Sequence, residues 1–328
     1  MKLIGIEEHY QMPSMGNIRL EWSKRTKRPE MMDLDLLLKH VFPRLSSPVE
    51  VFRLPEMDSV GMDMQVLSSG APSVQAIEDP VEAVALAREC NDFLADAVKR
   101  YPKRFSGFAT LPLADPEAAA RELERCVQQH GFCGAMIQGH QDFCYLDNPI
   151  FTPVLEAAQF LDVPVSLHVI DTQPDGLRML NGCPELMGPI WSWNTEAATH
   201  VMRMVINGVF DRFPKLQLIT GHMGEGLPYM LGRMDEGYET GMAHITKPLQ
   251  KKPSEYFKSN LFITTSGKYQ PTAMRCAIDA IGADRILFAT DYPFLSLEAS
   301  LSCINACLLT EEEQELIFYK NAERVLKL

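Results

Sequence analysis

The chain has 328 residues, of which 46% are hydrophobic and 23% are charged. These proportions are typical of a globular protein, and no apolar run reaches the roughly 18 residues of a membrane-spanning helix. The 31 basic and 43 acidic residues leave a net charge of −12, which argues against a nucleic-acid partner. The longest basic cluster, residues 24–28, is interpreted as a solvated loop.

Eight short apolar or β-branched runs recur along the chain and predict eight strands. In chain order they are residues 2–6, 64–68, 105–111, 133–137, 163–169, 216–220, 261–265 and 286–290. Because most of these runs are continuously apolar rather than alternating, they indicate a sheet that is covered on both faces.

Segments of helical period lie between the predicted strands. Two of them open with Asp-Pro-x-Glu, at Asp79 and Asp115, so that an aspartate caps the helix and a proline begins it. Gly131 ends the second helix, and a further helical pattern covers residues 195–213. Regular alternation of strand and helix predicts a parallel sheet with right-handed crossovers.

Eight such units predict a (β/α)₈ barrel, which we expect to form one domain over residues 1–328. The chain is longer than the ~250 residues of a typical barrel, so we expect long loops over residues 11–47, 171–194 and 237–260. An open doubly wound sheet is the alternative, but no Gly-x-Gly-x-x-Gly motif follows a predicted strand.

The N-terminal residues and the cysteines indicate the compartment. The first apolar run is short and turns acidic at Glu7, without the core of a signal peptide, so we expect a cytoplasmic protein. The eight cysteines contain no Cys-x-x-Cys pair and mostly lie in apolar patterns. We therefore predict reduced thiols in the core.

Side chains that bind metals stand at the ends of four predicted strands. The first strand ends with Glu7 and His9, which alternate and so point to the same side, while the fifth, sixth and eighth end with His168, His222 and Asp291. Carboxylate and imidazole are ligands of Zn²⁺ and Mn²⁺. Any one of them alone is more often a core residue or a helix cap, but the carboxyl ends of barrel strands meet at one face. The set therefore favours a metal site.

The remaining histidines are interpreted as structural residues in helices or loops. They are His40, His130, His140, His200 and His244. Glu8 alternates away from Glu7 and His9, and we expect it to contact neighbouring structure.

The motifs resemble the metal-dependent decarboxylase branch of the amidohydrolase superfamily. They are Glu7-x-His9, Leu167-His168, the Gly-His-Met-Gly-Glu of residues 221–225 and the Ala-Thr-Asp-Tyr-Pro-Phe of residues 289–294. This branch contains the γ-resorcylate, 2,3-dihydroxybenzoate and 5-carboxyvanillate decarboxylases and the aminocarboxymuconate semialdehyde decarboxylase. Residues 69–75, 104–112, 207–211 and 263–267 are similar too, so the likeness covers essentially the whole chain.

The resemblance implies a (β/α)₈ barrel with one divalent metal ion, Zn²⁺ or Mn²⁺. By motif position the metal ligands are Glu7, His9, His168 and Asp291, and the catalytic residues are Asp291, His222 and Glu225. A single metal also agrees with the end of the fourth strand, because Gln138 and its neighbours include no lysine for the bridging carbamate of a binuclear site.

Three further residues are candidates for substrate binding. Arg53 and Arg233 match positions where the decarboxylases keep arginines near the substrate, including across a subunit interface, and surface arginines are the alternative. Gln138 is the third candidate. In the hydroxybenzoate decarboxylases Pro-Arg usually follows the histidine of the fifth strand, whereas Val169 and Ile170 follow it here, so we expect a different substrate pocket.

The expected function is metal-dependent, non-oxidative decarboxylation of an ortho-hydroxylated aromatic acid of the dihydroxybenzoate type, reversible as phenol carboxylation. One alternative is a metal-dependent hydrolase of an amide, lactone or ester. Another is a non-catalytic barrel used for binding. The expected partners are a small aromatic acid and further copies of the chain in a dimer or tetramer, with neither nucleic acid nor membrane.

Overall fold

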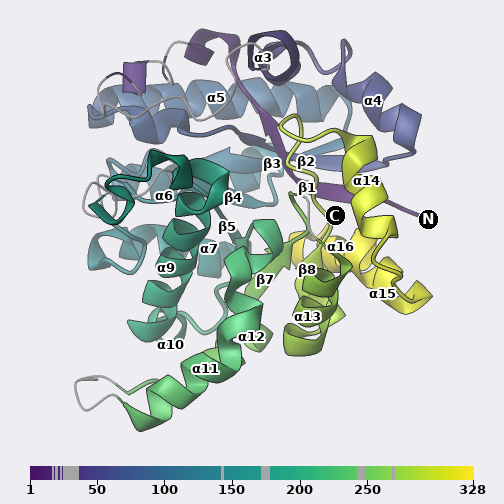
Figure 1. Cartoon of the computed structure of the whole chain (residues 1–328). Coiled ribbons are helices and arrows are strands. Elements are labelled where there is room, and N and C mark those ends of the chain that lie inside the picture. Colours follow the sequence, from purple (N-terminus) through teal and green to yellow (C-terminus); the bar gives the residue numbers. More distant parts are fainter. Residues whose placement is uncertain are drawn as a thin grey trace.

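The computed structural model describes residues 1–16, 18, 21, 22, 24, 37–141, 144–170, 178–241, 248–267 and 270–328. Eight parallel strands form one sheet in the order β1 to β8, with the helices around its outside (Figure 1). The first strand meets the chain that follows the last strand, which closes the sheet into a barrel. Ile6 N donates to Phe288 O at 3.1 Å, and His9 N donates to Tyr292 O at 2.7 Å. The (β/α)₈ barrel is thus confirmed, and the open doubly wound sheet is wrong.

Each strand matches one of the predicted runs. The strands are β1 (Ile4–Tyr10), β2 (Met64–Ser69), β3 (Phe105–Thr110), β4 (Gly134–Gln138), β5 (Val165–His168), β6 (Leu218–Thr220), β7 (Leu261–Thr264) and β8 (Ile286–Leu287). The largest difference is in β1, which runs on to Tyr10, so Glu7 and His9 lie within the strand rather than after it.

The α-helices connect the strands or follow them on the outside. They are α3 (Phe42–Ser46), α4 (Arg53–Val60), α5 (Pro80–Arg100), α6 (Pro116–His130), α7 (Thr152–Leu161), α9 (Ser192–Ile206), α10 (Val209–Arg212), α11 (Leu227–Thr240), α12 (Pro253–Ser259), α13 (Pro271–Ile281), α14 (Leu297–Asn305), α15 (Glu311–Glu315) and α16 (Asn321–Leu326). Asp79 and Asp115 cap α5 and α6 as predicted, since their side chains accept from the backbone N of Glu82 and Ala118.

The predicted long loops differ in content. In the described part of residues 11–47 there are short helical turns and α3, and in that of 171–194 there are short turns before α9. The prediction of a loop over residues 237–260 is wrong, because the end of α11 and all of α12 lie there, and Pro253 begins α12. Residues 25–28 of the basic cluster and His244 lie outside the described residues.

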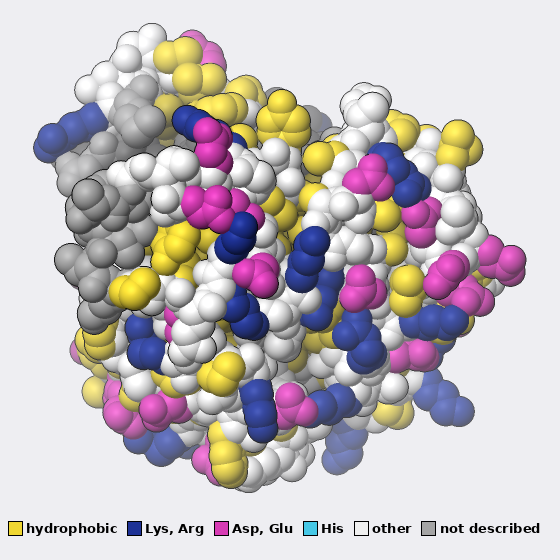
Figure 2. All heavy atoms as spheres, turned by 90° about the horizontal axis from the view of Figure 1, so that it is seen from below, with side chains coloured by type: hydrophobic (Ala, Val, Ile, Leu, Met, Phe, Trp, Pro, Cys, Tyr) yellow, Lys and Arg dark blue, Asp and Glu magenta, His cyan; other side chains and the backbone are white. Residues whose placement is uncertain are grey.

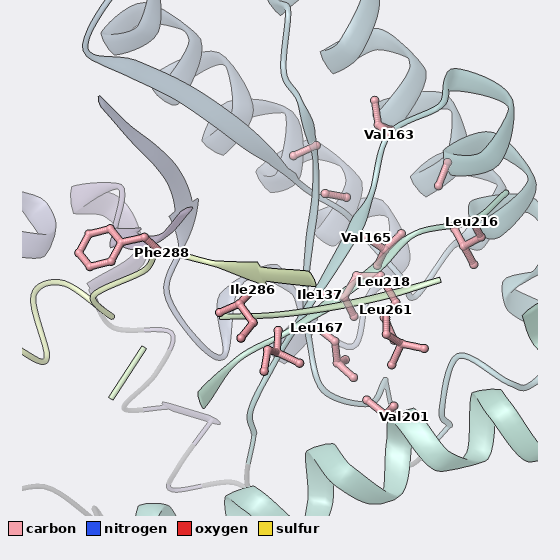
Figure 3. Close-up of a cluster of buried hydrophobic side chains, with 14 of the residues drawn as sticks. Ile137, Val163, Val165, Leu167, Val201, Leu216, Leu218, Leu261, Ile286 and Phe288 are labelled. Carbon is pink, nitrogen blue, oxygen red and sulfur yellow. The ribbon is translucent and has the colours of Figure 1, made fainter. Parts of the chain in front are cut away.

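The hydrophobic core has two layers, which explains the continuously apolar strands. Inward side chains fill the barrel, including Ile4, Ile6, Val66, Phe108, Met136, Ile219, Phe262 and Leu287. Outward side chains pack beneath the helices, as Figure 3 shows for Ile137, Val165, Leu167, Leu218 and Leu261 with Val201 of α9. A strand that is buried on both sides needs no polar alternation.

A β-bulge in β1 changes which side chains enter the barrel. Gly5 lies opposite Gln65 of β2 and Glu8 opposite Leu67, so three steps along β1 match two along β2. Ile6 and Glu7 therefore both face inward, and His9 follows them. Regular alternation would have turned Glu8 inward after Ile6.

The eight cysteines are free, as predicted, but not all are in the core. Cys90, Cys126 and Cys133 are buried, whereas Cys183 is exposed in a turn and the others are half-buried. Core burial was thus predicted too widely, because an apolar pattern does not separate a buried helix face from its margin.

One face of the molecule is mixed in charge. Lys and Arg side chains alternate with Asp and Glu over the face seen in Figure 2. Within the described part of the chain, none of the helices combines the length and the apolar character needed to cross a bilayer.

Candidate metal centre

Four of the predicted ligands converge at the carboxyl ends of the strands. Glu7 and His9 come from β1, His168 ends β5, and Asp291 follows β8; one ligand atom of each lies within 4.8 Å of all the others. His9 Nε2 is 3.2 Å from Asp291 Oδ1, and His168 Nε2 is 3.7 Å from Glu7 Oε1. Ligands at about 2.0–2.2 Å from a common ion are separated by such distances.

The hydrogen bonds of these residues leave the converging atoms available. Glu7 Oε1, His9 Nε2, His168 Nε2 and Asp291 Oδ1 are all buried, and none has a hydrogen-bond partner of suitable geometry in the described part of the chain. A buried polar atom without a partner is costly, and a cation would satisfy all four atoms at once. The residues present therefore fit a divalent ion.

The other atoms of three ligands are held by hydroxyl side chains at the ends of β2 and β7 and by one backbone carbonyl. Thr264 Oγ1 and Ser266 Oγ donate to Glu7 Oε2 at 2.6 and 2.8 Å. Ser68 Oγ is 3.2 Å from His9 Nδ1, and His168 Nδ1 donates to Val169 O at 3.0 Å. Such contacts orient a ligand and select the imidazole nitrogen that faces the metal.

His222 and Glu225 lie beside the cluster on an unusual turn. The backbone over η8 (His222–Gly226) is left-handed, with φ of +49° at His222, +55° at Met223 and +54° at Glu225. Residues other than glycine avoid the left-handed region, because it costs each of them about 1–2 kcal/mol. The turn brings His222 Nδ1 to 2.9 Å from Glu225 Oε1 and leaves Nε2 facing the ligands.

Charge at the site is shared between carboxylates and imidazoles. Burial opposes protonation of His222, but Glu225, Glu7 and Asp291 outweigh it and raise the pKa of His222 well above its usual value. Burial likewise works against ionisation of Asp291, yet His168, His222 and His9 hold its pKa well below the usual range. Burial raises the pKa of Glu225. The arrangement therefore pairs a positive imidazole with negative carboxylates.

The three substrate-binding candidates lie in different places. Gln138 is buried at the end of β4, opposite His168 in register, and its Nε2 donates to Ser69 O at 2.7 Å. Arg53 is also buried, so the surface alternative is wrong for it: it donates to the backbone carbonyl of His9 and to Gln65 Oε1.

Arg233 is not brought to the cluster within one chain. Its side chain is 72% exposed on α11, where it pairs with Glu236 at 2.7 Å. Substrate contact by Arg233 stays a prediction that requires a second copy of the chain.

Several contacts that support the site were not predicted from the sequence. Thr264, Ser266 and Ser68 hold ligands, and Glu8 binds the loop that carries Asp291. Hydroxyl side chains at the end of the seventh strand were the available signal for Thr264 and Ser266. For Glu8 the sequence predicted a contact with neighbouring structure but not its partners, which follow the last strand.

The chain is similar to known proteins over most of its length. The family model described as amidohydrolase matches residues 46–328. The γ-resorcylate decarboxylase of Polaromonas sp. (strain JS666 / ATCC BAA-500) is 39% identical over 322 residues, covering 95% of this chain and 99% of that protein.

Two solved structures share the fold over the whole chain. A 2,6-dihydroxybenzoate decarboxylase complexed with 2,6-dihydroxybenzoate has a TM-score of 0.91 at 36% identity and is covered over 100% of both chains. A dihydroxybenzoic acid decarboxylase from Polaromonas sp. JS666, with bound manganese and the inhibitor 2-nitroresorcinol, has a TM-score of 0.90 at 36% identity, covering 100% of this chain and 97% of that one. The chain belongs to the amidohydrolase family, in the branch that contains carboxy-lyases.

Proposed function

We propose that the protein decarboxylates an aromatic acid with an ortho hydroxyl group, of the 2,6-dihydroxybenzoate type, with one divalent metal ion. The single observation that carries this proposal is the convergence of Glu7, His9, His168 and Asp291 beside His222, in a chain whose relatives act on such acids. The reverse reaction carboxylates the phenol.

Glu7, His9, His168 and Asp291 hold the ion in this proposal. A bound divalent ion supplies positive charge that attracts the carboxylate and the ortho oxygen of the substrate together. Two carboxylates and two imidazoles accept either Mn²⁺ or Zn²⁺. We propose Mn²⁺ because the related structure contains manganese.

Asp291 carries the proton. Its carboxylate takes the proton of the ortho hydroxyl as the substrate binds and delivers it to the ring carbon that bears the carboxylate. The phenolate electrons support this protonation by moving into the ring. The bond to the carboxylate then breaks, CO₂ leaves, and the electron pair of that bond restores the aromatic ring and the phenolate.

His222 and Glu225 orient and stabilise this exchange. His222 Nε2 is 3.8 Å from Asp291 Oδ2, and Glu225 fixes the ring through Nδ1. A positive imidazole at this place favours the ionised form of Asp291, which is the form that accepts the phenolic proton. Gln138, Arg53 and Arg233 remain proposed substrate-binding residues, the last of them in a dimer or tetramer.

The experiment follows CO₂ release and resorcinol formation from 2,6-dihydroxybenzoate in D₂O. Deuterium should appear at the carbon that lost CO₂, and concentrated bicarbonate should drive the reverse reaction. Asp291→Asn keeps an oxygen ligand but cannot accept and return a proton, so it should retain metal while turnover falls by about 10²-fold or more. An Asn variant that decarboxylates at the wild-type rate would transfer the proton role to His222.

The hydrolase alternative is tested in the same assay, because a hydrolase would release neither CO₂ nor deuterated product. No specific observation favours it here, and the carboxy-lyase relatives argue against it. We further propose that residues 1–328 form one barrel domain of a cytoplasmic enzyme.

A further inference from the structure

Glu8 is a completely buried carboxylate that the proposed chemistry does not use. The bulge in β1 turns it out of the barrel, away from the ligands on either side of it, and its side chain is 0% exposed. It lies on Gly5, where a Cβ atom would come within 2.4 Å of Glu8 Oε1. A buried carboxylate needs compensating contacts, and these show what Glu8 does.

The partners of Glu8 are the two residues that flank Asp291. Thr290 donates twice, from its backbone N to Oε1 at 3.0 Å and from its hydroxyl to Oε2 at 2.5 Å. Tyr292 N donates to Oε2 at 3.3 Å. Glu8 thus holds the chain immediately before and immediately after Asp291, although 282 residues separate Glu8 from Thr290.

The backbone at Asp291 requires such support. Its φ is +60°, in the left-handed region that costs a residue other than glycine about 1–2 kcal/mol. Strand β8 has ended at Leu287, so no regular ladder fixes residues 290–292. Besides Glu8, β1 contacts this loop through His9, whose backbone N donates to Tyr292 O at 2.7 Å and whose Nε2 lies 3.2 Å from Asp291 Oδ1. Without Glu8 the loop would lose three of its contacts with β1.

Arg53 completes this arrangement from the outer side. It donates to the carbonyl of His9, and its guanidinium carbon lies 4.5 Å from the centre of the Tyr292 ring. β1 and the Asp291 loop are therefore joined at one place by the side chains of Glu8 and Arg53.

We propose that Glu8 is a positioning residue that keeps the Asp291 carboxylate within reach of His9, His168 and the substrate by binding Thr290 and Tyr292. This inference rests on the proposed role of Asp291. Glu8 is turned away from the ligand cluster, and it acts through the backbone of the loop.

The test is Glu8→Gln, whose amide presents an NH₂ group to donors that need an acceptor. We expect Mn²⁺ affinity of the metal-free protein, measured by competition with a fluorescent chelator, to fall about 10–100-fold. At saturating Mn²⁺, kcat for 2,6-dihydroxybenzoate should fall while KM changes little, because the substrate contacts remain.

Glu122→Gln is the matched control. Glu122 is also buried and accepts hydrogen bonds, from Asn91 and Arg125, but it lies on α6. It should lower the melting temperature without changing Mn²⁺ affinity. Wild-type affinity in Glu8→Gln, or an equal loss in Glu122→Gln, would overturn the positioning role.

A second variant covers the case in which Glu8→Gln does not fold. Thr290→Val removes only the hydroxyl that donates to Glu8, and Thr110→Val removes a buried hydroxyl at the end of β3 as its control. Only Thr290→Val should weaken Mn²⁺ binding, and equal affinities would contradict the proposal. If the wild type releases no CO₂ from 2,6-dihydroxybenzoate, the proposed function fails, but the Mn²⁺ affinities still decide the role of Glu8.

Discussion

Gly221 leaves the space that the Glu7 carboxylate occupies. A Cβ atom at Gly221 would lie 2.7 Å from Glu7 Oε1, closer than nonbonded atoms approach. Its φ of −68° suits any residue, so alanine there tests space and not backbone conformation. We expect Gly221→Ala to displace Glu7 and weaken Mn²⁺ binding about 10–100-fold, as measured by chelator competition.

Gly232→Ala is the control for this substitution. Gly232 lies within α11, and a Cβ atom there would meet nothing within 4 Å. Alanine should stabilise the helix by up to about 1 kcal/mol and leave metal affinity unchanged. If Gly221→Ala also bound Mn²⁺ normally, Glu7 would not be confined as described.

Residue types predicted well which side chains converge at one face of the barrel, but they predicted the supporting contacts less well. Carboxylates and imidazoles at strand ends predicted the cluster of Glu7, His9, His168 and Asp291, because all parallel strands present their carboxyl ends at one face. Glu8 was assigned only a contact with neighbouring structure. Its partners belong to the opposite end of the chain, and sequence spacing carries no information about them.

The loop after β4 is tied to α9 by a buried histidine. Leu146 N donates to His200 Nε2 at 2.9 Å, so the ring accepts as a neutral imidazole. Burial lowers the pKa of His200 to about 3, with His140 and Arg203 adding to the effect. An unfolded chain binds a proton at His200 below about pH 6.5, which the folded protein does not.

Acid should therefore destabilise the protein through His200. The contribution of His200 to the free energy of unfolding is fully present above pH 6.5 and is lost as the pH falls toward 3. The loss amounts to about 2 kcal/mol at pH 5. Urea unfolding at pH 7.5 and pH 5 measures it. His200→Gln, whose amide oxygen can still accept from Leu146, should lose that part of the pH dependence; an unchanged dependence would contradict this.

Elements with strong local signals were predicted, and those set by distant contacts were not. Asp79 and Asp115 predicted the starts of α5 and α6, because a helix cap depends only on neighbours in sequence. The extension of β1 to Tyr10 and its bulge depend instead on pairing with β2 and with the loop after β8. Because Glu7, Glu8 and His9 are polar, a search for apolar runs ended the first strand too early.

At the scale of the whole molecule, the predicted substrate role of Arg233 depends on the proposed oligomer. It lies exposed on α11, so a role at the substrate requires another copy. Mixed, refolded Asp291→Asn and Arg233→Ala chains would then restore sites that combine one intact Asp291 with one intact Arg233. In a two-fold dimer an equal mixture should recover about one quarter of wild-type activity. If Arg233→Ala alone is fully active and mixing restores no further activity per site, Arg233 is a surface residue without a role at the substrate.

The meeting of β1 with the loop after β8 also has a consequence for folding. Glu7 and His9 come from the first strand, and Asp291 follows the last, so the cluster exists only after the barrel has closed. Contacts between segments this far apart form late and slowly. During synthesis the chain therefore acquires most of its core before it acquires high affinity for the ion, and the metal stabilises a finished barrel rather than nucleating it.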